Sequence, residues 1–302
     1  MSDTIILDSV SQLHESLGLH KPKHPLVTVL QAEEVKSKIG LSNIKIVNNL
    51  YQITFKKGIC GTIRYGRNSY DYEEGTLIFT APGQVITYEH NAELDDYQGW
   101  SLCFHPDLIR KSELGSKIDG YSFFDYDAHE ALHLSDDERI TIEELLEKII
   151  KEYSLNLDKH SQHLIVSNIQ LLLDYCLRFY DRQFITRSDL NTDLVSKFDR
   201  YLKAYYHSDL VQDKGIPSVQ QCAEELNLSS NYLSDLLKKE TGKTAQEHIH
   251  LHIIDKAKTS LLNSSEPVSA IGYDLGFEYP QHFSNLFKSK TGMSPSEYRR
   301  LN

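Results

Sequence analysis

Three residues of this sequence have the spacing of a catalytic metal site. His129, Glu130 and His133 match the pattern H-E-x-x-H, in which two histidines on one face of a helix bind zinc and the glutamate activates a water molecule. Glu152 could act as a third ligand. The pattern needs a helix that presents both imidazoles, but residues 135–138 form a capping box that starts a new helix two residues later. We therefore favour a loop or a single helical turn here over a metal-dependent hydrolase.

Alternating histidines form a second candidate metal site. His248, His250 and His252 lie in a segment with helical periodicity, so only His248 and His252 share a face. Ordinary, partly buried histidines explain this segment better than a metal site does. The sequence also contains no phosphate-binding loop, no dinucleotide fingerprint and no G-x-S-x-G motif. We expect neither an enzyme nor a cofactor.

A third group of polar residues belongs to an internal repeat. The last third of the chain matches itself at an offset of 50 residues, and self-similarity at a fixed period indicates a duplicated structural unit. Before the matched block the offset becomes 49, so one copy has a turn one residue longer. The identical pairs are Ser234 with Ser284, Leu236 with Leu286, Lys238 with Lys288, Thr241 with Thr291, Gly242 with Gly292 and Glu247 with Glu297.

Each copy has the pattern of two short helices joined by a tight turn. The first copy, residues 218–242, opens with a capping box, breaks at residues 227–229 and ends at Gly242. The second copy, residues 267–292, repeats the two helices, with a break at Gly276-Phe277 and an end at Gly292. Such a pair describes a helix-turn-helix. A capping box at residues 244–247 starts a helix that links the copies. If the two second helices lie parallel and about 34 Å apart, both can enter the major groove on one face of a DNA duplex.

The apolar positions of these second helices leave one polar face on each. Asparagine and glutamine can pair bidentately with adenine, aspartate can accept a hydrogen bond from cytosine, and lysine suits phosphate. The outward residues, which we predict to contact DNA, are Ser230, Asn231, Ser234, Asp235 and Lys238 in the first copy and Gln281, His282, Asn285 and Lys288 in the second.

Residues 194–302 resemble the AraC/XylS family of bacterial transcription factors, named after the arabinose regulator. The resemblance rests on Leu226-Asn227-Leu228-Ser229, Leu275-Gly276-Phe277, Gln281-His282-Phe283-Ser284 and Gly292-Met293-Ser294-Pro295. It implies that base reading falls to Asn231, Ser234, Asp235, Gln281, His282 and Asn285. Asp235 and Asn285 stand where the family often has arginine, which argues against guanine contacts at these two positions.

The N-terminal half has a different pattern. From about residue 26 to 105, apolar residues alternate over short stretches between turn residues, which predicts a small antiparallel barrel or sandwich. A helix pair follows at about residues 136–185. Its second helix carries two apolar stripes, so either it is fully buried or the pair also forms a dimer interface. The family resemblance extends less sharply to this half and implies a cupin-like barrel with a helix pair that commonly dimerises.

Charge is unevenly distributed along the chain. The 302 residues include 32 Lys and Arg against 43 Asp and Glu, and the net charge of −11 argues against a nucleic-acid partner. Residues 190–302, however, carry 13 basic and 14 acidic residues, so the acidity lies almost wholly in the N-terminal part. With few basic residues, we expect modest DNA affinity per monomer and a dependence on dimeric or repeated sites. The four widely spaced cysteines indicate buried thiols, and no apolar run is long enough for a membrane span.

Together these patterns predict an α+β protein of two domains. Residues 1–188 would form a cupin-like sensing or dimerisation domain, and residues 189–302 an all-α domain with two helix-turn-helix units. The expected function is that of a cytoplasmic, homodimeric regulator that binds promoter DNA under the control of a small-molecule effector and, as an activator, contacts RNA polymerase. Two alternatives remain open, namely the metal-dependent hydrolase and a DNA-binding regulator without an effector.

Overall fold

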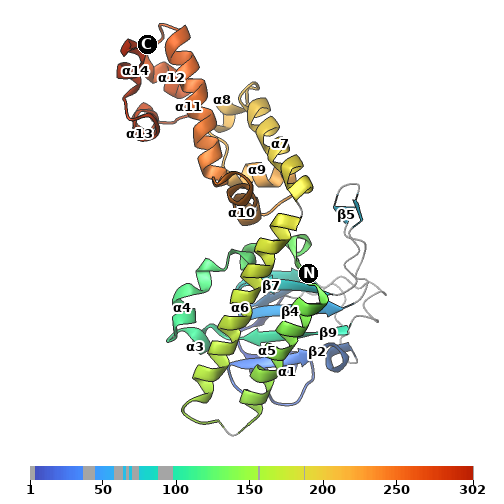
Figure 1. Ribbon diagram of the computed structural model, residues 1–302. Helices are drawn as coiled ribbons and strands as arrows, with labels where there is room; N and C mark the ends of the chain where they lie inside the picture. The colour runs from blue at the N-terminus through green and yellow to red at the C-terminus, as the bar shows by residue number, and fades with distance from the viewer. Residues whose placement is uncertain are drawn as a thin grey trace. The chain divides into compact units, whose positions relative to one another are not determined.

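The computed structural model describes residues 4–36, 45–57, 64–65, 68–69, 75–87, 98–155, 157–186 and 188–301. The chain divides into two compact units, Met1–Ile185 and Thr186–Asn302. The first contains all the described strands and the second only helices, as the colours of Figure 1 show.

The larger sheet of the N-terminal unit has five strands in the order β10-β7-β4-β9-β2, and neighbouring strands run antiparallel. Phe55 lies opposite Trp100, and the two buried rings stack with centroids 5.7 Å apart. The next pair along these two strands, Thr54 and Ser101, points to the other face of the sheet, where the two hydroxyls lie 3.0 Å apart. The strands are β2 (Val27–Gln31), β4 (Tyr51–Lys57), β7 (Thr76–Thr80), β9 (Gln98–Phe104) and β10 (Leu132–His133).

A smaller sheet has the order β1-β3-β8, built from β1 (Thr4–Leu7), β3 (Lys45–Asn48) and β8 (Gln84–Thr87). The pairing of β1 with β3 is parallel, so the prediction of a purely antiparallel arrangement is wrong at this pair. Helix α1 (Val10–Ser16) joins the core that contains Leu30 of one sheet and Ile46 of the other. Strands β5 (Arg64–Tyr65) and β6 (Asn68–Ser69) form a separate hairpin. A closed cupin-like barrel is not traced by the described strands and stays a prediction.

A helix pair covers one face of the larger sheet, in agreement with the sequence pattern (Figure 1). Helix α5 (Asp136–Ser154) begins with the predicted capping box, and the hydroxyl of Tyr153 near its end accepts a hydrogen bond from the backbone N–H of Val29 at 3.3 Å. Helix α6 (Ser161–Thr186) packs Tyr180 against Phe79, with ring centroids 6.1 Å apart. The short helices α2 (Ala32–Lys36), α3 (Pro106–Ile109) and α4 (Glu113–Lys117) lie in the connections.

The second apolar stripe of α6 is uncovered. Ile165 and Ile169 on the first stripe are fully buried, whereas Leu164 and Leu171 on the second are 43% and 45% exposed. Tyr175, one further turn along, is half-buried. A fully buried helix is therefore the wrong interpretation of the two stripes.

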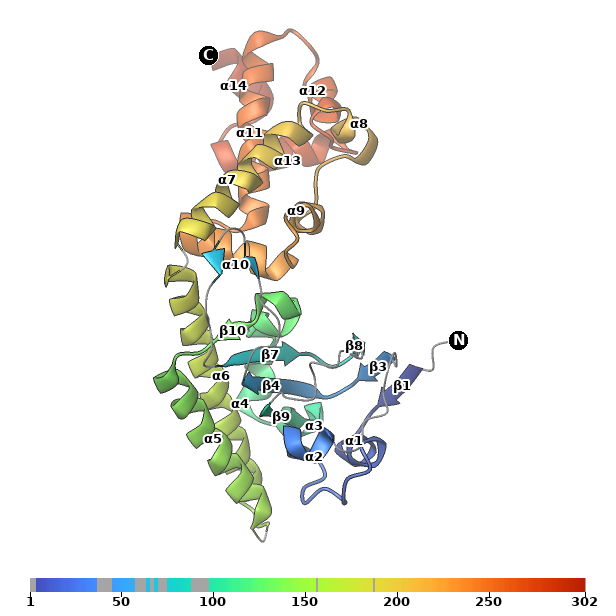
Figure 2. The same ribbon diagram turned by 90° about the vertical axis from the view of Figure 1, so that its right-hand side faces the viewer.

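The C-terminal unit is entirely helical over its described residues. Two helix pairs, α9 with α10 and α12 with α13, flank the long helix α11, as Figure 2 shows from the second viewpoint. Helix α7 begins at Ser188, beside the predicted domain boundary at residues 188 and 189, and the division between the two units falls after Ile185. The helices are α7 (Ser188–Tyr205), α8 (Leu210–Lys214), α9 (Val219–Leu226), α10 (Ser230–Thr241), α11 (Ala245–Asn263), α12 (Val268–Asp274), α13 (Pro280–Thr291) and α14 (Pro295–Leu301).

Three of the four cysteines can be placed. Cys103, Cys176 and Cys222 are buried free thiols, as the sequence suggested, and burial raises the pKa of Cys103 and of Cys222 to about 12. Cys60 lies outside the described residues. None of the described helices has the length and apolar content that a membrane span requires.

Candidate nucleic-acid interface

The first helix-turn-helix consists of α9 and α10. Ser218 and Gln221 form the predicted capping box of α9, and Asn227 ends this helix in the left-handed conformation with φ of 54°. The turn is closed by the backbone N–H of Leu228, which donates to the carbonyl of Ala223 at 2.9 Å. Ser229 then caps α10, because its hydroxyl accepts from the backbone N–H of Tyr232 at 3.2 Å.

The second helix-turn-helix, α12 with α13, repeats the turn but not the side-chain caps of the two helices. The N–H of Phe277 donates to the carbonyl of Gly272 at 3.0 Å, at the offset of 49 residues predicted for this part of the repeat. Gly272 replaces Ala223 where the helices cross, and a Cβ atom here would lie 3.3 Å from the ring of Phe283. The ring of Phe283 therefore occupies the space that a side chain at position 272 would need.

The ends of the two second helices match atom by atom at the offset of 50. The hydroxyl of Thr241 donates to the carbonyl of Leu237 at 2.7 Å, and that of Thr291 to the carbonyl of Phe287 at 2.8 Å. Gly242 and Gly292 follow with φ of 77° and 81°, the conformation that favours glycine at a helix end. Both copies then start a new helix with a capping box. The duplication predicted from the sequence is confirmed at this level of detail.

The polar face of α10 is only partly open. Its core side is buried as predicted and consists of Tyr232, Leu233, Leu236 and Leu237. Of the five residues predicted to contact DNA, Asn231 and Lys238 are exposed, while the other three are half-buried: Ser230, Ser234 and Asp235. Lys239 is also exposed.

The polar face of α13 is more open. Phe283 and Phe287 are fully buried, and all four residues predicted to contact DNA are exposed: Gln281, His282, Asn285 and Lys288. The amide groups of Gln281 and Asn285 offer a donor and an acceptor each, which is the chemistry that reads adenine. Their contact with bases stays a prediction.

Both second helices have lysines at their C-terminal ends, where positive charge is favourable to the helix dipole. Lys238 and Lys239 occupy the last turn of α10, and Lys288 and Lys290 the last turn of α13. All four are exposed. This position, beyond the polar residues of each first turn, is suited to phosphates that border a groove.

One exposed residue beside this face was not predicted. Tyr279 precedes α13 and is 55% exposed. At the offset of 50 residues Tyr279 corresponds to Ser229. The repeat could therefore have singled out Tyr279 from the sequence, because it is an aromatic residue where the first copy has a helix-capping residue.

The H-E-x-x-H residues do not form a zinc site on a helix. Residues Ala128–Glu130 form a single 3-10 turn, whereas His133 belongs to strand β10 and is buried, with its Nδ1 3.2 Å from the hydroxyl of Thr76. The metal-dependent hydrolase interpretation is therefore wrong, because it requires one helix that presents both histidines.

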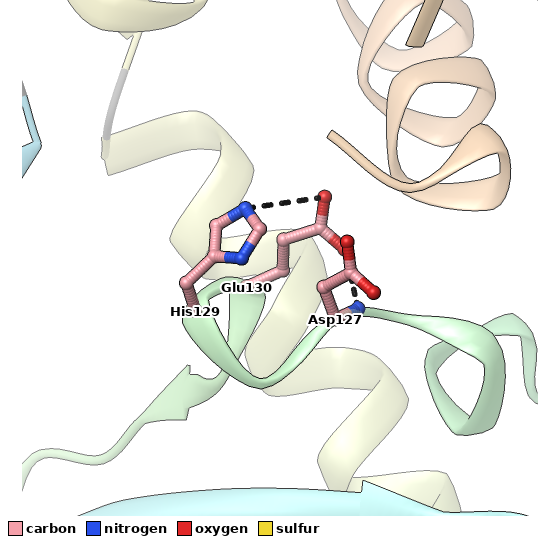
Figure 3. A group of neighbouring side chains, drawn as sticks. All are labelled: Asp127, His129 and Glu130. Atoms are coloured by element: carbon pink, nitrogen blue, oxygen red, sulfur yellow. Dashed lines mark hydrogen bonds and ion pairs between the residues drawn. The ribbon is translucent and has the colours of Figure 1, made fainter. Parts of the chain in front are cut away.

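Among the described residues, the ligand atoms of Asp127, His129 and Glu130 lie within 4.8 Å of one another, and neither His133 nor Glu152 belongs to this group (Figure 3). Glu130 is already engaged, because its Oε2 accepts from the backbone N–H of Asp127 at 2.7 Å as half of a capping box. His129 Nε2 lies 4.0 Å from the other oxygen. Asp127 and Glu130 thus use their side chains to cap the single turn at residues 128–130.

The three alternating histidines of α11 have separate surroundings. The Nε2 atom of His248 lies 2.7 Å from the hydroxyl of Thr241, and His250 pairs with Gln246. The ring of His252 packs against Tyr206, with centroids 5.2 Å apart. Burial lowers the pKa of all three histidines, so they are neutral at pH 7.

Comparisons with known proteins agree with this geometry. Residues 222–301 match the family described as helix-turn-helix domain. The arabinose operon regulatory protein of Escherichia coli is 24% identical over 243 residues, which cover 79% of this chain and 76% of that protein. An uncharacterised HTH-type transcriptional regulator of Staphylococcus aureus is 26% identical over 138 residues, which span 46% of this chain but only 17% of that protein's length.

Among solved structures, the C-terminal domain of the response regulator AraT from Geobacillus stearothermophilus is 28% identical, with a TM-score of 0.32, and the match covers 36% of this chain and 85% of that domain. The duplicated helix pairs and the sequence matches lead to one assignment. Residues 222–301 of the chain form an AraC-type helix-turn-helix domain.

Proposed function

We propose that the chain is a sequence-specific DNA-binding transcription regulator of the AraC type. One observation carries this proposal: two helices of 12 residues each, α10 and α13, follow equivalent turns and present polar side chains in their first turns. A single helix pair of this kind is common in proteins, but two equivalent copies on either side of one helix are suited to two successive major-groove contacts.

In this proposal the two helices read different base pairs. Asn231 in α10 and Gln281 and Asn285 in α13 would pair with adenine through their amide groups, and Asp235 would accept from the amino group of cytosine. The exposed lysines at the helix ends would hold the phosphates. Because the half-buried residues of α10 need a closer approach to the DNA, α13 should contribute more of the sequence preference.

The N-terminal unit is proposed to join two chains and to respond to a ligand. The exposed leucines of α6, Leu164 and Leu171, would form the contact between two copies. A chain of side-chain hydrogen bonds, each 2.9 Å long, runs from Asn48 of the smaller sheet to Gln52 and on to Thr54 of the larger one. Hydroxyl and amide groups of this kind can exchange such bonds with a small polar effector.

Titration of the full chain onto DNA tests the proposal. Sites selected from the source genome would be compared with scrambled duplexes of equal length over a range of salt concentrations. We expect tight binding to the selected sites alone and an affinity that falls as salt rises, because bound phosphates release counterions. Equal affinity for both duplexes, or no salt dependence, would contradict the proposal. Ligand-dependent thermal stabilisation of the chain would separate an effector-controlled regulator from one without an effector.

A further inference from the structure

The start of α13 differs chemically from the start of α10. Ser229 caps α10 with its hydroxyl, whereas Tyr279 occupies the equivalent position before α13 and makes no capping hydrogen bond. Pro280 follows at the first helical position, where its missing N–H is not needed. The position has therefore lost its role in helix capping and holds a large aromatic side chain instead.

That aromatic side chain is held in place on the open face. The ring of Tyr279 meets the ring of His282 edge to face, with centroids 5.4 Å apart and planes at 63°. This contact puts the two rings on one side of the start of α13, next in the chain to the exposed Gln281. Tyr279 is nevertheless 55% exposed, which leaves part of its ring in water in the free protein.

We infer that Tyr279 and His282 form an aromatic pair that packs against the methyl group of a thymine in the major groove. This inference rests on the proposed function, since it requires α13 to enter that groove with its first turn. The thymine methyl is the apolar group that base pairs present there, and an exposed ring is its natural partner. The second helix-turn-helix thereby selects an A·T pair at a position where the first copy, with Ser229, makes no such selection.

A tyrosine near DNA has one alternative contact, a hydrogen bond from its hydroxyl to a phosphate. Such a contact strengthens binding to every sequence equally. The two contacts are separable, because Tyr279→Phe keeps the ring and removes the hydroxyl, whereas Tyr279→Ser removes both and introduces the capping residue of the first copy. Tyr273 in α12 is 56% exposed and provides a matched control as Tyr273→Ser.

The experiment selects binding sites for the full chain from random duplex DNA and then replaces each thymine of the selected site, one at a time, with deoxyuridine. We expect one replacement to weaken binding by about fourfold, the effect of burying one methyl group. The Tyr279→Ser variant should bind the duplex with that replacement as tightly as it binds the duplex with thymine. Tyr279→Phe and Tyr273→Ser should bind like the original chain, and selection with Tyr279→Ser should lose the preference for thymine at that position.

Three results would overturn the inference. No effect of any deoxyuridine replacement on the original chain would exclude a methyl contact without reference to a variant. Equal weakening by Tyr279→Phe and Tyr279→Ser on all sequences would assign the residue to a phosphate. Failure of the full chain to enrich any sequence would overturn the proposed function as well, whereas the first two results leave it standing.

Discussion

Gly276 and Gly215 meet backbone to backbone. A Cβ atom added to Gly276 would lie 2.8 Å from the carbonyl carbon of Gly215, and both glycines have positive φ, 88° and 74°. The hydroxyl of Tyr205 donates to the carbonyl of Gly215 at 2.9 Å and fixes this end of α8. The turn of the second helix-turn-helix is thus seated directly on the chain that leads into the first.

Gly276→Ala should therefore destabilise the C-terminal unit. We expect a loss of roughly 2–4 kcal/mol in the free energy of unfolding, since the left-handed conformation costs about 1 kcal/mol and the backbone must also move apart. Gly242→Ala is the matched control, because Gly242 has φ of 77° but no atom within 4 Å of its Cβ position. Urea unfolding of both variants measures the difference, and equal losses would show that the close approach has no energetic importance.

Asn285→Ala should weaken binding to a selected DNA site by about 1–3 kcal/mol, because the variant would lose the proposed bidentate contact with a base. The slope of affinity against salt should not change, since no phosphate contact is lost. Asn263→Ala, which truncates an exposed asparagine at the end of α11, should bind like the original chain. Titrations monitored by fluorescence anisotropy measure both affinities, and an equal effect of the two variants would remove Asn285 from the reading face.

Lys288→Ala should weaken binding to all sequences by a similar factor and should reduce the salt slope by about one. Lys111→Ala removes the same charge from an exposed position in the N-terminal unit. If both variants change the slope equally, the effect comes from net charge and not from a phosphate contact at the end of α13.

Leu164→Ser with Leu171→Ser should raise the dissociation constant of a dimer by at least about tenfold, because each substitution removes an apolar side chain from the proposed contact. Leu177→Ser is the control: Leu177 is 43% exposed but lies six residues from Leu171, on a different side of α6. Sedimentation equilibrium distinguishes the variants. A monomeric original chain would contradict the dimer directly.

Stability should fall as pH decreases below about 6.5. Burial, followed by the nearby charge of Lys256, lowers the pKa of His252 from its ordinary value of 6.5. The unfolded chain therefore takes up a proton at a higher pH than the folded chain, so acid favours unfolding. His252→Phe keeps a ring against Tyr206 and removes the titrating group; its urea midpoint should depend less on pH between 7 and 5 than that of the original chain. An unchanged dependence would exclude His252 as its source.

The parts of the fold that follow from local chemistry could be predicted. The capping boxes, the turn at Asn227 and the glycine ends of α10 and α13 each depend on residues within a few positions of one another. The internal repeat shows the turn and the glycine ends a second time. Strand β1 could not be predicted, because its four residues become a strand only by pairing with β3 some 40 residues later.

The site was predictable to the same extent. Which residues face outward on α10 and α13 follows from helical periodicity, but the half-burial of Ser234 and Asp235 depends on how neighbouring helices pack around them. The H-E-x-x-H residues show the reverse case. Their spacing suits a helix, yet the capping box of Asp127 and Glu130 closes a single turn, and His133 then pairs into the larger sheet.

Helix α11 connects the two helix pairs through 19 residues without a glycine or proline. At 1.5 Å per residue it is a rod about 28 Å long, shorter than the roughly 34 Å of one turn of the DNA double helix. A rigid connection of this kind makes binding depend on the rotational positions of the two half-sites around the DNA axis as well as on their sequences. If half a helical turn were inserted between two correct half-sites, they would face opposite sides of the duplex. The protein would then contact only one of them.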